Sequence, residues 1–125
     1  MLGNTDAMAT IAVKDIGKAR AFYEGVVGLK PVGTEGDQVV AYQSGNARVM
    51  VYVSQYAGTN QATAVTWIVG DDVEGVVQAL KARGAKFEHY DLPETTRKGD
   101  VHLAATTKVA WFKDPDGNIL SIVNG

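Results

Sequence analysis

Few side chains in this sequence could carry out chemistry unaided, and those few are widely spaced. The chain contains no cysteine, which excludes thiolate nucleophiles, disulfides and cysteine-ligated zinc. His89 and His102 are too far apart to form a metal-binding motif. Ser121 lacks the Gly-x-Ser-x-Gly context of a nucleophilic serine, and Glu88 or Asp91 could act as a general base only if burial raised its pKa. The catalytic residues are therefore unknown at this level.

Composition limits the kinds of binding partner and the cellular location expected for the protein. The chain has 125 residues, 46% apolar and 21% charged, which is typical of one soluble globular domain over residues 1–125. With a net charge of −2 and no basic stripe, a nucleic acid partner is not expected. No apolar run approaches the roughly 20 residues of a membrane span, and residues 1–13 lack the features of a secretory signal. A cytoplasmic location is the default expectation.

The first half of the chain predicts one strand, one helix and three further strands. The β-branched run at residues 8–13 indicates a strand. Apolar residues at helical spacing follow over residues 15–28, with Asp15 as the expected N-cap and Gly28 at the C-terminal end. The three strands are expected at residues 30–32, 38–42 and 47–53.

The same order of elements returns in the second half. A strand is expected at residues 64–69 and a helix at residues 71–84, where Asp71 and Glu74 have the spacing of a capping box. Three strands are then expected at residues 86–91, 108–112 and 118–123. The repeat predicts two modules, at about residues 7–56 and 62–125.

The second copy contains one long polar insertion, at residues 92–107. It has no clear period, so it is expected to be a loop, and loops of this length are often lids or binding loops. A disordered surface insertion is the other interpretation, and the sequence leaves both open. His102 is expected to be solvated within this loop, although a loop lying over a site could bring it to a ligand. His89 is expected to be an exposed cross-strand residue.

Three segments carry a resemblance to a known family. They are IAVKDIGKARAFYEGVVGL at residues 11–29, DDVEGVVQALKARGAKFEHYDLP at 71–93 and AWFKDPDGNILSIV at 110–123. In order and spacing they resemble the vicinal oxygen chelate superfamily of glyoxalase I, bleomycin-resistance proteins and extradiol dioxygenases. The resemblance implies an α+β fold of two βαβββ modules, which form a cup-shaped mixed β-sheet with helices on the convex face. The apolar pattern alone also permits a ferredoxin-like α+β sandwich, which the paired three-strand runs disfavour.

The resemblance also implies positions for metal ligands, which are His, Glu or Gln in the family's enzymes. Met8 and Ala64 stand at the expected histidine positions, and Ser121 stands where the family's Asp-Gly-Asn-x-x-Glu pattern has its glutamate. The strand at residues 48–53 contains no Glu, Gln or His. These side chains are poor ligands for a divalent ion, so no metal and no cofactor are expected.

The lining of the cup follows from alternation along the strands. If Met8 faces the cup, residues of the same parity share that face. In the turn at residues 114–118, Pro115 suits a type I turn and Gly117 a G1 bulge, which sets Trp111 opposite Ser121 and directs it into the cup. The predicted ligand-binding residues are Met8, Thr10, Met50, Tyr52, Thr66, Trp111 and Ser121, with His102 from the loop.

This lining suits a small, partly aromatic organic molecule rather than a charged metabolite. The leading hypothesis is a metal-free small-molecule-binding protein of the glyoxalase/bleomycin-resistance type. The alternative is a glyoxalase- or dioxygenase-like enzyme, a lyase or isomerase, and a metal-free enzyme using Asp91, His89 or His102 is a third. Side chains that fill the cup themselves would leave no ligand site. A homodimer is expected, because pairing covers open strand edges.

Overall fold

The structure is a computed structural model that describes residues 1–125. After a short 3₁₀ turn, η1 (Leu2–Asn4), its N-terminal half (residues 9–53) contains one sheet and one helical segment. The strands are β1 (Ala9–Val13), β2 (Lys30–Glu35), β3 (Val39–Ser44) and β4 (Ala47–Val53), in the order β1-β4-β3-β2. Within this sheet only the β1–β4 pair is parallel. The helical segment is α1 (Ile16–Arg20), which continues as the π-helix η2 (Ala21–Val26).

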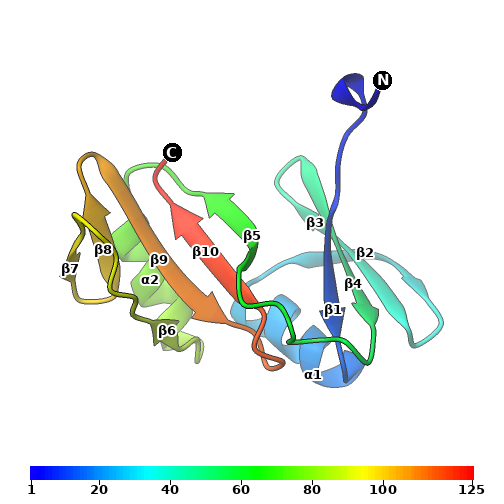
Figure 1. The fold of residues 1–125 in the computed structure, drawn as a ribbon. Coiled ribbons are helices and arrows are strands. Elements are labelled where there is room, and N and C mark those ends of the chain that lie inside the picture. Colours follow the sequence, from blue (N-terminus) through cyan, green and yellow to red (C-terminus); the bar gives the residue numbers. More distant parts are fainter.

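The C-terminal half (residues 63–123) forms the second sheet, which faces the viewer in Figure 1. Its path runs β5-β10-β9-β8-β7, and β6 also pairs with β9. The elements are β5 (Thr63–Ile68), α2 (Val73–Ala82), β6 (Phe87–Glu88), β7 (Thr96–Lys98), β8 (Val101–Ala104), β9 (Thr107–Lys113) and β10 (Ile119–Val123). No helix of the structure is long and apolar enough to cross a membrane.

Side-chain caps fix where the two helices begin. Asp15 caps α1 as predicted, by accepting a hydrogen bond from the Lys18 N–H. The prediction for the second helix is wrong by one residue. Its N-cap is Asp72, which accepts from the Gly75 N–H, and not Asp71. Asp71 and Asp72 are both good N-cap residue types, so the sequence pattern alone does not distinguish them.

The prediction of a loop at residues 92–107 is wrong, because this segment contains the β7–β8 hairpin. Its strand β8 pairs with the beginning of β9, and β6 pairs with the end of β9. The predicted strand at residues 86–91 is correspondingly only two residues long. One edge of β9 is thus shared by two short strands, and the insertion extends the sheet.

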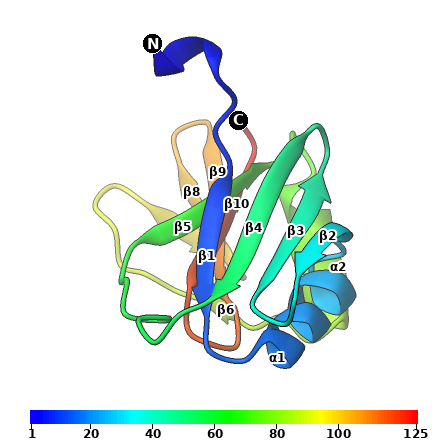
Figure 2. The same cartoon turned by 90° about the vertical axis from the view of Figure 1, so that its right-hand side faces the viewer.

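The helices lie between the two sheets and share one hydrophobic core with both. Turned by 90°, the first sheet faces the viewer in Figure 2, whereas α2 lies behind the second sheet in Figure 1. Phe22 of η2 packs on Phe112 of β9, with ring centroids 6.3 Å apart. Each sheet therefore has a helix-covered face and an open face, and the two open faces look in different directions. This is the predicted α+β class, with open sheets consistent with the walls of a cup.

The β9–β10 turn holds the two halves together. Asp114 is buried and accepts a 2.8 Å hydrogen bond from the Tyr23 hydroxyl of η2. Asn118 donates through its Nδ2 to the Ala12 carbonyl of β1, and Asp116 accepts from the Lys14 N–H. The turn that the sequence predicts between two antiparallel strands therefore also joins the two halves.

Candidate functional site

Alternation along β1 and β4 produces the predicted open face of the first sheet. Ile11 and Val13 are buried toward the helices, whereas Thr10 is exposed on the other side. The parallel pairing sets Thr10 beside Met50 and Ala12 beside Tyr52. At the rim of this face, Met8 is 42% exposed and borders a recess of about 520 Å³ that also contains Arg48.

On the second sheet, the turn at residues 114–118 sets the predicted register. Gly117 has φ +88°, and its N–H donates to the Asp114 carbonyl. As predicted, Trp111 pairs with Ser121. Phe112 and Leu120, the neighbours of this pair, are fully buried toward the helices. Trp111 and Ser121 therefore lie on the open face.

A pair of hydroxyls occupies the position next to Trp111. Ser121 is 2% exposed, and its Oγ lies 2.7 Å from the Thr66 Oγ1 of β5. The predicted alternation along β5 fails at Ala64, because the pairing with β10 shifts between Thr63 and Val65. Thr63 accepts a hydrogen bond from the Trp111 Nε1 at 3.2 Å. The Thr63 hydroxyl is thus a third hydroxyl at this face, where the sequence predicts only the methyl group of Ala64.

The prediction that His102 is solvated is wrong. The side chain is buried, with 1% of its surface exposed. It lies in β8 opposite Val109, which puts it on the same face as Trp111, and the two ring centroids are 4.8 Å apart. Its Nε2 accepts the Tyr90 N–H at 3.0 Å, so the neutral ring carries its proton on Nδ1. Burial lowers the pKa of His102 from 6.5, which favours this neutral form.

Tyr90 is a site residue that the sequence did not single out. It packs edge-on against Trp111, with centroids 5.2 Å apart, and over His102. The Tyr90 hydroxyl and the His102 Nδ1 are both buried without a hydrogen-bond partner. Because unpaired buried polar groups are uncommon, these two atoms mark a place where a water or a ligand can bind. No local sequence feature marks Tyr90, since its position depends on the β7–β8 hairpin.

His89 and Glu88 lie at the edge of this group and are engaged in ion pairs, whereas Asp91 is exposed. The exposed His89 lies 2.7 Å from Asp100, which also binds Lys81. These two contacts, that of Lys81 first, lower the pKa of the Asp100 carboxyl. Glu88 forms an ion pair with Lys113. Glu88 lies opposite Trp111 in the β6–β9 pairing, and the His89 ring lies edge-on to the His102 ring, with centroids 6.3 Å apart, so these ion pairs border the open-face residues.

The structure brings the predicted ligand-binding residues together as two groups, one on each open face. Met8, Thr10, Met50 and Tyr52 form the first group. Thr66, Ser121, Trp111 and His102 form the second. No hydrogen bond or ring contact joins the two groups. In one chain each group therefore forms one wall, without an opposite wall.

The residues present do not fit the divalent metal that the family resemblance implies. Met8, Ala64 and Ser121 offer a thioether, a methyl group and a hydroxyl, and Thr63 next to them adds only a second hydroxyl. No three His, Cys, Asp or Glu side chains of the chain are grouped to hold a metal ion. The chemistry that this face offers is hydrogen bonding and aromatic contact.

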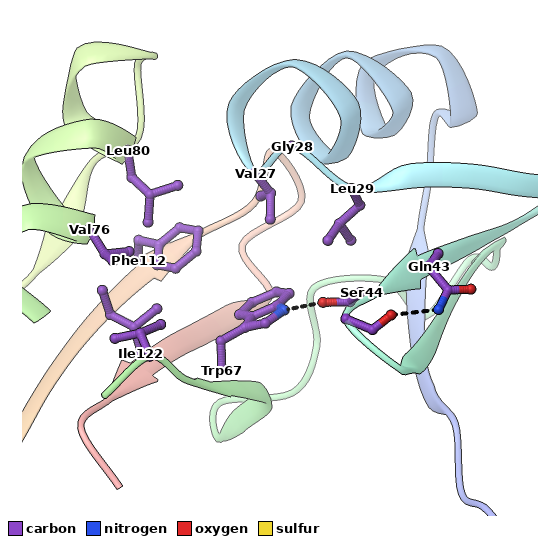
Figure 3. Close-up of a pocket in the computed structure, with 12 residues that line it drawn as sticks. Val27, Gly28, Leu29, Gln43, Ser44, Trp67, Val76, Leu80, Phe112 and Ile122 are labelled. Carbon is purple, nitrogen blue, oxygen red and sulfur yellow. Dashed lines mark hydrogen bonds between the residues drawn. The ribbon is translucent and has the colours of Figure 1, made fainter. Parts of the chain in front are cut away.

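A second concave region lies on the helix side, at the junction of the two halves. It is a cavity of about 310 Å³, with walls from η2, β3, β5, α2, β9 and β10 (Figure 3). Trp67 packs against the core but remains partly exposed and lines this cavity. Its Nε1 donates to the Ser44 Oγ at 2.9 Å across the junction. Sequence patterns do not reveal this cavity, because its walls come from both halves.

Comparisons with known proteins agree with this architecture. The model of the Glyoxalase/Bleomycin resistance protein/Dioxygenase superfamily matches residues 7–122. No curated protein matches the sequence significantly.

Solved structures with the same fold include three of distant sequence. A lactoylglutathione lyase from Agrobacterium tumefaciens is 17% identical, with a TM-score of 0.71 and coverage of 96% of this chain and 92% of that one. A mutant of the fosfomycin resistance protein FosX from Listeria monocytogenes, complexed with Mn(II) and 1S,2S-dihydroxypropylphosphonic acid, is 14% identical, with a TM-score of 0.71 and coverage of 100% and 92%. An integron cassette protein from the mobile metagenome of a Halifax Harbour sewage outfall is 15% identical, with a TM-score of 0.71 and coverage of 96% and 97%.

At these identities the structures show the fold alone, whereas the family model spans nearly the whole sequence. The chain belongs to the Glyoxalase/Bleomycin resistance protein/Dioxygenase superfamily.

Proposed function

We propose that this protein binds a small, partly aromatic organic molecule on its open sheet faces without the help of a divalent metal. The observation that carries the proposal is the hydroxyl pair of the buried Ser121 and the exposed Thr66, 2.7 Å apart. It lies where the family pattern would place a metal-binding carboxylate. Two hydroxyls that already bond to each other can accept or donate one further hydrogen bond to a neutral ligand, but they do not hold a divalent ion.

The neighbours of the hydroxyl pair support an aromatic ligand. Trp111 lies directly opposite Ser121, and its indole ring is held by Thr63, His102 and Tyr90. A side chain fixed in this way loses little conformational freedom when a ligand packs against it. The side chains that hold the ring are uncharged, and the strand partner of Trp111, Glu88, is already paired with Lys113, which favours an uncharged ligand over an anion.

A second copy of the chain would complete the cup. The two open faces look in different directions (Figures 1 and 2), so one chain does not enclose a ligand between them. Ile68 at the end of β5 is 75% exposed, and Met8 and Thr10 are exposed on the first sheet. We therefore propose a homodimer in which the open face of one sheet lies opposite an open face of the partner.

The second candidate is a glyoxalase- or dioxygenase-like enzyme, a lyase or isomerase acting on a small organic substrate. The observation that favours it is the neutral His102 beside Trp111, because the Nδ1–H of a buried neutral imidazole can donate a hydrogen bond to a substrate oxygen that gains negative charge. Its Nε2 is used by the Tyr90 N–H, so only Nδ1 could face a reacting group.

A thermal-shift screen of neutral aromatic metabolites and antibiotics, repeated in EDTA, tests the proposal. We expect ligands that raise the melting temperature equally with and without EDTA, in protein that carries no stoichiometric metal. Hits that require added manganese, zinc, nickel or iron, or turnover of a hit to product, would support the enzyme instead.

A further inference from the structure

The helix-side cavity between the two halves has the features of a second binding site, separate from the open faces. Its volume of about 310 Å³ lies within the range of small-ligand pockets, roughly 300–1,000 Å³. Figure 3 shows Val76 and Leu80 of α2 across from Val27 and Leu29, with the Phe112 ring beside the α2 side chains and the Trp67 ring below Val27. Both halves therefore contribute wall residues.

The aromatic wall of the cavity is fixed before any ligand binds. The Trp67 ring stacks on Phe112, with centroids 6.3 Å apart and an interplanar angle of 27°. The Trp67 Nε1 donates to Ser44 in the other half, so the ring is held at both its face and its edge. A rigid ring of this kind offers a flat apolar surface at little entropic cost.

One end of the cavity is polar but uncharged. Ser44 accepts the Trp67 hydrogen bond, which leaves its own hydroxyl proton free to donate. Gln43 donates through Nε2 to the Gly45 carbonyl, which leaves its Oε1 free to accept (Figure 3). No Asp, Glu, Lys, Arg or His side chain is among the lining residues. Arg83 lies outside the lining, beside Gly28.

We infer that this cavity binds a small, neutral, mostly apolar molecule that carries one hydroxyl or carbonyl group. The ring system would pack between Trp67 and the α2 side chains, with its polar group at Gln43 and Ser44. A carboxylate of the same shape would lose its hydration without a charged partner in the lining, so it should bind more weakly. Because the walls come from both halves, such a ligand would also stabilise their packing.

The chain has only two tryptophans, and each reports on one site. Trp67 lines the helix-side cavity, whereas Trp111 lies on the open face. Their indole N–H resonances, assigned with Trp67→Phe and Trp111→Phe variants, therefore distinguish binding in the cavity from binding on the open face. Failure of this inference and failure of the proposed function are thus separate outcomes.

The test is an NMR titration of the protein with 2-naphthol and, in parallel, with 2-naphthoate. We expect 2-naphthol to shift the Trp67 resonance in a saturable manner, and 2-naphthoate to bind about tenfold more weakly or not at all. Val76→Phe, which fills the cavity from α2, should weaken 2-naphthol binding about tenfold or more. Gln43→Leu removes the free acceptor with little change in size and should weaken it several-fold, while Trp111→Phe should leave it unchanged.

Several results would overturn the inference. These are no shift of Trp67 at millimolar 2-naphthol, a shift of Trp111 alone, or equal binding of 2-naphthoate. Unchanged affinity in Gln43→Leu would also overturn it, and this variant serves if Val76→Phe does not fold. A Trp67 shift that follows protein concentration rather than 2-naphthol would assign the cavity to a contact between copies of the chain.

Discussion

The hydroxyl of Tyr23 donates a 2.8 Å hydrogen bond to Asp114, joining the helix of the first half to the turn of the second. Both side chains are buried, and Asp114 also accepts from the N–H groups of Asp116 and Asn118 and from the Asn118 side chain. Burial, and then the adjacent carboxylate, raise the pKa of Tyr23, so the phenol stays protonated and remains a donor. The walls of both candidate sites depend on this junction.

Removal of the Tyr23 hydroxyl should destabilise the fold by a modest amount. Tyr23→Phe deletes one charge-assisted hydrogen bond but leaves Asp114 with its other donors, so we expect a loss of about 1.5–3 kcal/mol in the free energy of unfolding. Asp114→Ala should cost more, because it leaves several buried donors unpaired. Urea unfolding monitored by circular dichroism measures both. Tyr56→Phe, at an exposed tyrosine, is the control and should change little.

The register of Trp111 and Ser121 could be predicted from sequence because a local feature determines it. The Asp-Pro-Asp-Gly-Asn turn fixes which residues of β9 and β10 are opposite each other, and a turn of this type requires no tertiary contact. The N-cap at Asp15 and the burial of the alternate residues Ile11 and Val13 are likewise determined by local sequence.

The features that the sequence did not predict depend on contacts between distant segments. The β7–β8 hairpin forms because β8 pairs with the edge of β9, and its short strands carry little alternation of their own. The burial of His102 follows from that pairing. The irregularity near Ala64 arises from pairing with β10, and the different directions of the two open faces follow from helix packing between the sheets.

His102 should make stability depend on pH near neutrality. Burial lowers its pKa in the folded state from the ordinary 6.5, so below that pH the unfolded chain binds the proton more readily. The free energy of unfolding should therefore be unaffected above about pH 7 and fall as the pH drops below 6.5. His102→Gln keeps an acceptor for the Tyr90 N–H without titrating, and should lose this part of the pH dependence.

Urea unfolding at a series of pH values between about 5 and 8 measures this effect. His89→Gln is the second variant. His89 is exposed and contributes less than burial does to the lowered pKa of His102, so most of the pH dependence should remain. If the His102→Gln and wild-type curves had the same slope below pH 6.5, His102 would not be the titrating group.

Dimer formation should depend on the open faces. Ile68→Lys places a charge on an exposed apolar position of β5, so we expect it to shift a dimer toward monomer without lowering the stability of the chain. Light scattering coupled to size exclusion measures the mass, and Leu2→Lys, another exposed apolar position, is the control. A monomeric wild type at micromolar concentration would rule out the proposed dimer.

Trp111 should be the main aromatic contact of a ligand on the open face. Trp111→Ala removes buried area and ring contact, so we expect a loss of about 1–3 kcal/mol in binding free energy for a hit from the thermal screen. Calorimetry measures the affinity, and Trp67→Phe, on the helix side, should leave it unchanged. Equal affinity in the Trp111→Ala variant would place that ligand elsewhere.

The most direct test of metal-independent binding is a calorimetric titration of one open-face ligand in EDTA and again in manganese. The ligand should be one whose addition shifts the Trp111 indole resonance. The hydroxyl pair of Ser121 and Thr66 predicts the same affinity in both buffers. Binding that disappears in EDTA and returns with manganese would contradict the account.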